Sequence, residues 1–147
     1  MAFTHNGKFK LPGYESIFDM SGTIGGVEYF TWAEALHYEG TGYFRRPESK
    51  EIVDNILRHA KHLGRFREHL GHPLIITSWY RDPVTNKRVG GASKSMHVQG
   101  LASDLYCPSM SIRELKQEVV KFGWFGGRGY YSSFIHLDSG KNREWYG

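Results

Sequence analysis

The feature that most constrains this chain is a pair of strand-like runs that each present a potential metal ligand. The run 101–106 follows His97 and contains Asp104, and the run 133–137 contains His136. Two neutral imidazoles and one carboxylate form a nitrogen and oxygen donor set that Zn²⁺ accepts, and a catalytic zinc keeps a fourth position for water. If the three side chains meet at one point, the chain is expected to be a hydrolase.

The spacing of these residues predicts where their side chains point. Gly100 can turn the chain after His97 at little steric cost. In the strand that follows, Ala102 and Asp104 share one face, and Leu101, Ser103 and Leu105 share the other. His136 and Asp138 are two residues apart and project to the same side of their strand. Asp138 can therefore either reach a metal-bound water or accept a proton from the His136 ring.

The order of these residues is stronger evidence for a metal site than their types alone. A chain with eight histidines can bring some of them together by chance. The pattern is Ser95-x-His97-x-x-Gly100-x-Ala102-x-Asp104, with His136 in a later apolar run. It resembles the zinc D-Ala-D-Ala carboxypeptidases, which share a fold with lysostaphin-type peptidases and the hedgehog signalling domain. The segments 76–92 and 129–138 also match, so the resemblance covers residues 74–139 and extends more loosely from Phe30.

The resemblance implies a role for each matching residue. His97, Asp104 and His136 would be the zinc ligands. Arg81 would hold the substrate peptide or polarise its carbonyl, a role that suits a permanently charged, forked guanidinium. Ser95 would donate a hydrogen bond to substrate at the entrance of the cleft. The structural alternatives are a surface salt bridge for Arg81 and a turn or cap for Ser95.

The sequence also predicts two tyrosines near the site. Tyr130 and Tyr131 lie in the matching segment just before His136. Tyr131 is taken as a candidate substrate-binding residue, and packing in an aromatic core is the alternative for both.

One position departs from the pattern of the family. Many relatives carry a Glu or Asp three residues before the last zinc histidine, where it acts as general base, and here that residue is Ser133. A serine cannot take up a proton at neutral pH, so Asp138 is the candidate base. A base has to lie about 3 Å from the water that it deprotonates. The equal alternative is that Asp138 orients His136 from behind the metal site.

The resemblance implies metal-assisted hydrolysis of peptide bonds in peptidoglycan stem peptides, by a D-Ala-D-Ala carboxypeptidase or an endolysin-type endopeptidase. Zinc would lower the pKa of its bound water to about 7 and polarise the scissile carbonyl. The alternative, to which Ser133 gives substance, is a weak or inactive zinc scaffold that binds cell wall or a protein partner.

Composition limits the partners. The chain has 147 residues, 39% hydrophobic content and a net charge of +4, which fits one folded domain and an anionic partner such as cell-wall polymer. No dense Lys/Arg stripe indicates nucleic acid, and the basic residues of 58–67 are expected to be a solvated face. Cys107 is the single cysteine, which excludes an internal disulfide. We expect a monomer.

The chain shows no apolar run of the roughly 20 residues that a membrane span needs. Its start also lacks the apolar stretch of a signal peptide, although the expected place of action is the periplasm or cell wall. Three explanations are open: a shortened chain, export by another route, or a phage-type lysin.

We expect an α+β fold with a small antiparallel sheet and helices on one side, of the hedgehog and DD-peptidase type. Residues 1–29 are expected to form a Gly-rich arm packed on a zinc peptidase domain of residues 30–147. Helical spacing predicts a long helix over 48–70 that ends at Gly71, with His59, His62 and His69 on its polar face or boundary. Capping boxes at Thr31 and Ser111 predict two further helices. The remaining expectations are a central strand over 74–79, a loop over 82–96 and an edge strand over 143–146.

Overall fold

The computed structural model describes residues 2–4, 7–38, 43–92 and 94–147, with side chains from residue 7 onward. Its centre is a five-stranded sheet in the order β11-β9-β10-β8-β7. The five strands are β7 (Ile75–Ser78), β8 (Ala102–Tyr106), β9 (Gly127–Tyr130), β10 (Ile135–Asp138) and β11 (Arg143–Tyr146). Neighbouring strands are antiparallel, except that β11 pairs in parallel with β9. The expected mixed fold with a small, mainly antiparallel sheet is therefore confirmed.

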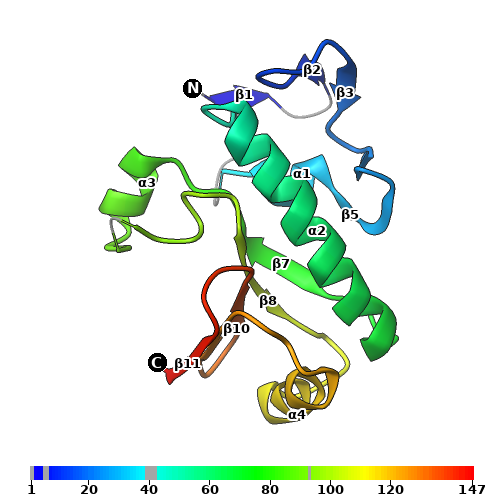
Figure 1. The fold of residues 1–147 in the computed structure, drawn as a ribbon, viewed down its shortest axis with the longest axis vertical. Helices are drawn as coiled ribbons and strands as arrows, with labels where there is room; N and C mark the ends of the chain where they lie inside the picture. The colour runs from blue at the N-terminus through cyan, green and yellow to red at the C-terminus, as the bar shows by residue number, and fades with distance from the viewer. Residues whose placement is uncertain (1, 5–6, 39–42, 93) are drawn as a thin grey trace.

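Figure 1 shows the N-terminal strands at the top of the view, a long helix in front of the sheet and a shorter helix at the bottom. The helices are α1 (Trp32–Leu36), α2 (Lys50–Leu70), α3 (Pro83–Arg88) and α4 (Ile112–Phe122). Three two-stranded ladders pair β1 (Ala2–Thr4) with β6 (Tyr43–Arg45), β2 (Lys8–Lys10) with β3 (Ile17–Asp19), and β4 (Thr23–Ile24) with β5 (Val27–Thr31). In the described part of the chain, no helix combines the length and the apolar character that crossing a membrane requires.

Local sequence signals set the limits of α2 and α4. The Ser49 hydroxyl accepts a hydrogen bond from the backbone of Ile52 at the start of α2, and Gly71 ends the helix at φ 72°. A side chain at such a positive φ is strained, which is why glycine is common there. Ser111 and Glu114 form the expected capping box of α4. The long helix and the two capping boxes predicted from the sequence are confirmed.

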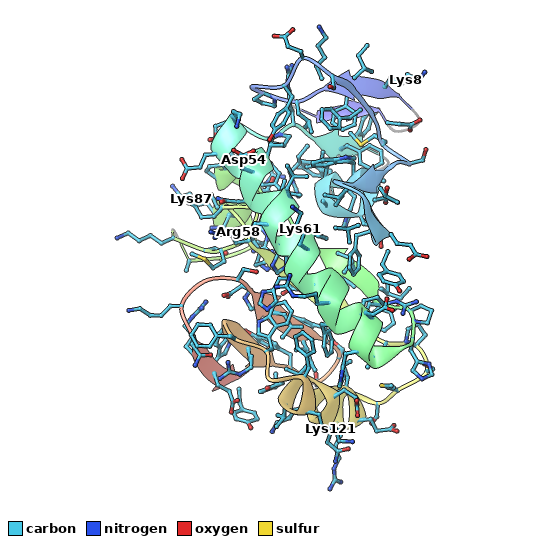
Figure 2. All side chains as sticks on the ribbon, turned by 45° about the vertical axis from the view of Figure 1, so that its right-hand side comes forward. Lys8, Asp54, Arg58, Lys61, Lys87 and Lys121 are labelled. Atoms are coloured by element: carbon cyan, nitrogen blue, oxygen red, sulfur yellow. The ribbon has the colours of Figure 1, made fainter. Side chains whose placement is uncertain are left out.

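The two faces of the sheet are different. Leu105, Ile135 and Leu137 point to the side of α2 and α4 and belong to one buried apolar cluster with Leu63 and Leu115 of these helices. The exposed side of α2 carries Arg58 and Lys61 (Figure 2), as expected for a solvated face. The opposite face of the sheet carries Asp104 of β8 and His136 of β10, and it lines an open cleft.

Three expectations about local structure were wrong. The strand β7 lies at the edge of the sheet and not in its centre; Ile76 is buried in the core, whereas Ile75 is 40% exposed. The expected loop 82–96 contains α3, because the Asp82 side chain caps Thr85 N at 2.7 Å. His59 is fully buried, not at a boundary, and its ring contacts the hydroxyls of Ser103 and Ser139.

The N-terminal segment contributes to the same interior. Leu11, Met20 and Ile24 are at most 2% exposed and lie in the apolar cluster that contains the residues of α2. The division of the chain at residue 30 stays a prediction, since one continuous cluster spans both sides of it.

Candidate metal centre

Three side chains meet on the open face of the sheet. The ligand atoms of His97, Asp104 and His136 all lie within 4.8 Å of one another. Asp104 Oδ1 is 3.2 Å from His97 Nε2 and 3.0 Å from His136 Nδ1. His136 and Asp104 are directly opposed in the antiparallel register of β10 and β8, which brings their side chains together.

A tight turn carries His97 to the other two residues. Gly100 adopts φ 77°, and a Cβ there would lie 2.8 Å from Ile56 Cγ1, so the position requires glycine. The backbone N–H of Leu101 donates to the Met96 carbonyl and closes the turn. The ring Nδ1 of His97 donates to the Trp79 carbonyl at 2.7 Å. This bond leaves Nε2 directed at Asp104.

His136 is fixed through its opposite nitrogen. Its Nε2 donates to Asp138 Oδ2 at 2.8 Å, so Nδ1 faces Asp104. In each neutral ring, one nitrogen thus carries the hydrogen, and the other presents a lone pair to the same carboxylate oxygen. Three acceptor atoms at this distance repel one another unless a cation lies between them. The donor set and its supporting hydrogen bonds therefore fit a metal ion of the zinc type.

The charge of Asp104 suits metal binding, whereas at His136 a metal has to compete with a proton. Burial alone would raise the pKa of Asp104, but the His97 and His136 rings outweigh burial and hold the pKa of this carboxyl well below its usual range. Asp104 is therefore ionised, as a ligand has to be. Burial also opposes a charge on His136, but Asp104 and Asp138 on its two sides raise the pKa of the ring.

Asp138 lies behind His136 and away from the cleft. The side chain is fully buried, and its two oxygens accept hydrogen bonds from Gly127 N, Gly140 N, Arg143 and His136. Burial raises the pKa of Asp138, but the bonds from His136 and Arg143 dominate and lower it strongly. This environment matches the orienting alternative and differs from that of an accessible general base.

An open cleft of about 520 Å³ lies over the three ligands. Its lining consists of basic, aromatic and small side chains around the His–Asp–His group. The lining residues are Arg81, Val89, Ala92, Lys94, Ser95, Met96, His97, Asp104, Tyr131, Phe134, His136, Arg143 and Trp145. Asp104 is the only acidic residue of this lining among the described residues.

The other expected site residues also line this cleft. Arg81 Nη2 lies 3.9 Å from Asp104 Oδ2, and the guanidinium donates to the side-chain oxygens of Ser78 and Asn86. The Ser95 hydroxyl accepts the backbone N–H of His97, so it caps the turn while lining the cleft. Tyr131 stacks on Phe134 with ring centroids 4.5 Å apart. Tyr130, in contrast, is a core residue with 5% exposure.

Two cleft residues were not identified from the sequence. Arg143 and Trp145 come from β11, which was expected only as an edge strand. The parallel pairing of β11 with β9 brings them to the site, and no local pattern encodes that pairing. One sequence signal for this pairing is a pair of glycines in β9, Gly127 and Gly129, because glycine allows another chain segment to approach closely. A Cβ at these positions would lie 2.2 Å from Asp138 Oδ2 and 2.5 Å from the Trp145 ring.

Fold and site together define a protein with a mixed, mainly antiparallel sheet and a His–Asp–His group in an open cleft that could hold a metal ion. The peptidase M15 family matches residues 29–138, and this chain belongs to that family. The matched region contains the three candidate ligands, Arg81 and Asp138. The resemblance seen in the sequence is therefore confirmed.

Two curated relatives match part of the chain. The peptidoglycan L,D-endopeptidase MepK of Escherichia coli (strain K12) is 32% identical over 80 residues, which are 50% of this chain and 43% of MepK. The zinc D-Ala-D-Ala carboxypeptidase of Streptomyces albus G is 32% identical over 77 residues, which are 50% of this chain and 30% of that protein. The chain thus matches less than half the length of either relative.

Proposed function

We propose that this chain is a zinc peptidase that hydrolyses peptide bonds in peptidoglycan. The observation that carries the proposal is the convergence of His97 Nε2, Asp104 Oδ1 and His136 Nδ1 on the floor of an open cleft. Membership of the peptidase M15 family supports the reaction class. The names of the two relatives support zinc as the metal, peptidoglycan as the substrate and the cell wall as the place of action.

Zn²⁺ is the cofactor, and His97, Asp104 and His136 are the residues that would hold it. When bound there, zinc supplies Lewis acidity, which polarises a carbonyl and makes water more acidic. The protein's own contribution is to keep both imidazoles neutral and aimed inward. It does so through the Trp79 carbonyl on one ring and Asp138 on the other.

Arg81 is the residue that we assign to the substrate carbonyl. Its guanidinium lies at the edge of the ligand group, and Ser78 and Asn86 hold it in place. A fixed positive charge at this position stabilises the negative charge that develops on the carbonyl oxygen during hydrolysis. Ser95 and Tyr131, which line the same cleft, are the candidate contacts for the rest of the peptide.

Asp138 is assigned an orienting role in place of the base role. Its carboxylate is fully buried and accepts five hydrogen bonds from four residues, so it has no free oxygen directed at the cleft. A base has to be within hydrogen-bond reach of the proton that it takes. The geometry supports Asp138 as the partner that fixes His136.

The test of the function uses metal content and product analysis. The purified protein is expected to carry about one zinc per chain and to release peptides from isolated peptidoglycan. Mass spectrometry of the products would show whether a terminal D-Ala or an internal bond is cleaved. Chelation and His97→Ala should both abolish release. The matched control is His72→Ala, which removes an exposed histidine outside the cleft. Full activity of His97→Ala would overturn the proposal.

A second candidate function is a zinc-scaffold module that binds cell wall without cleaving it. The observation in its favour is the cleft itself, where Asp104 is the only acidic residue among the described lining residues. Ser133 occupies the position that carries the base in many relatives. Co-sedimentation with peptidoglycan sacculi separates the two functions. Zinc-dependent binding with no released peptide would favour the module, and zinc-dependent release would favour the peptidase.

A further inference from the structure

The residue that holds Asp138 lies outside the family match. The match ends at residue 138, and Arg143 follows in β11. Arg143 Nη1 donates to Asp138 Oδ1 at 3.0 Å, and Nη2 donates to Oδ2 at 2.7 Å. Two parallel N–H···O bonds fix both the position and the plane of a carboxylate, which a single bond cannot do.

The surrounding backbone keeps the arginine in this position. In the parallel ladder, Arg143 is paired with Gly127, whose own N–H also donates to Asp138. Arg143 Nη1 has a second acceptor in the Lys141 carbonyl at 2.9 Å. The guanidinium carbon lies 5.0 Å from the centre of the Trp145 ring, and that ring lies 5.2 Å from the His136 ring. Strand β11 thus contacts the ligand His136 both directly and through Asp138.

This ion pair differs from an ordinary surface salt bridge. The Arg143 side chain is 40% exposed, but Asp138 is 0% exposed. Exposed pairs contribute little to stability, whereas a buried carboxylate that loses its partner becomes an unpaired buried charge. Without Arg143, Gly127 and Gly140 still bond Asp138 Oδ1, but Oδ2, the acceptor of the His136 bond, loses its second donor.

From this geometry we propose that Arg143 is a positioning residue of the metal centre. It fixes the Asp138 carboxylate, and Asp138 in turn fixes the orientation of His136 and keeps the hydrogen on Nε2. The inference rests on the proposed zinc site, but it does not require that the protein cleaves peptidoglycan. Residues that orient metal ligands in this way commonly change metal affinity or activity by about 10–100-fold when they are replaced.

The experiment measures zinc affinity by competition with a chromophoric chelator. Arg143→Ala should weaken zinc binding by about tenfold or more. Arg143→Lys should recover only part of the affinity, because an ammonium keeps the charge but lacks the fork. The matched control is Lys141→Ala, which removes a neighbouring exposed cation and should bind zinc as the parent does. Circular dichroism of each zinc-free variant reports whether it is folded.

A second measurement separates positioning from general stability. In the zinc-loaded parent, the Nε2 proton of His136 should give a downfield proton resonance that exchanges slowly with water. In Arg143→Ala this resonance should broaden or vanish. An unchanged resonance together with zinc affinity within twofold of the parent would overturn the role of Arg143. If the parent binds zinc but releases no peptide, the proposed function fails, while the affinities still decide the inference.

Discussion

At the scale of single residues, the metal centre is defined by which nitrogen of each histidine is free. His97 presents Nε2 because its Nδ1 is bonded to a backbone carbonyl, and His136 presents Nδ1 because its Nε2 is bonded to Asp138. The sequence predicted the three ligand residues from their order in the chain. The sequence could not predict which ring nitrogen faces the site. The partner that fixes His97 is the backbone carbonyl of Trp79, and every residue has such a carbonyl.

Asp138→Asn tests the assignment of this residue. If Asp138 orients His136, the substitution should weaken zinc binding by about tenfold or more, and excess zinc should restore much of the lost hydrolysis. The reason is that the asparagine amide has the shape of the carboxylate but lacks its negative charge, so it is a weaker acceptor for the Nε2–H of His136. Zinc titrations monitored by peptide release measure both quantities. Loss of hydrolysis at every zinc concentration, with unchanged zinc affinity, would instead assign Asp138 as the base.

At the scale of elements, the sequence predicted what local chemistry determines. Helix α4 begins at a capping box and ends at Gly123 with φ 76°, and both signals are visible in the sequence. The edge position of β7 and the parallel pairing of β11 depend instead on contacts between distant segments. The start of α3 at Asp82-Pro83 is also a local signal for a helix, although the polar sequence of 82–96 favours a loop.

Ser111→Ala should lower the free energy of unfolding by about 1 kcal/mol, because the Ser111 hydroxyl accepts the backbone N–H of Glu114 at 3.1 Å. Urea denaturation measures the change. Arg113→Ala, an exposed substitution in the same turn, is the control and should stay within about 0.5 kcal/mol of the parent. Zinc affinity should be the same in all three proteins, and a large change in it would contradict the separation of α4 from the metal centre.

At the scale of the whole molecule, structure and chemistry lie on opposite faces of one sheet. The apolar side chains of β8 and β10 pack on α2 and α4, and Asp104 and His136 alternate with them toward the cleft. The alternation of the strands predicted this division correctly. It did not predict the inward packing of two α2 histidines, the buried His59 and the half-buried His62, which stacks on Trp124 with centroids 3.6 Å apart.

This packing predicts how stability depends on pH. Burial, helped by the Arg65 charge, lowers the pKa of His62 to about 4 in the folded protein, from an ordinary value of 6.5. As the pH falls from 6.5 to 4, the unfolded chain binds a proton that the folded protein does not, so stability falls. In His62→Phe this loss should be smaller. Urea denaturation of the zinc-free proteins across this range measures the difference. His59, whose pKa is lowered by burial and then by His62, remains in both proteins and adds to the loss in each. A difference that stays constant with pH would contradict the prediction.

The open face of the sheet has a consequence for diversification. The cleft is walled by the segment between β7 and β8, by the connection between β9 and β10, and by β11. None of these walls contributes the apolar side chains of β8 and β10 that pack on α2 and α4. Substitutions at wall residues that neither form nor support the His–Asp–His group, such as Val89, Ala92 and Lys94, can therefore reshape the cavity that selects a peptide while the ligand geometry is preserved. A scaffold of this kind can acquire new bond preferences through its rims alone, without rebuilding its interior.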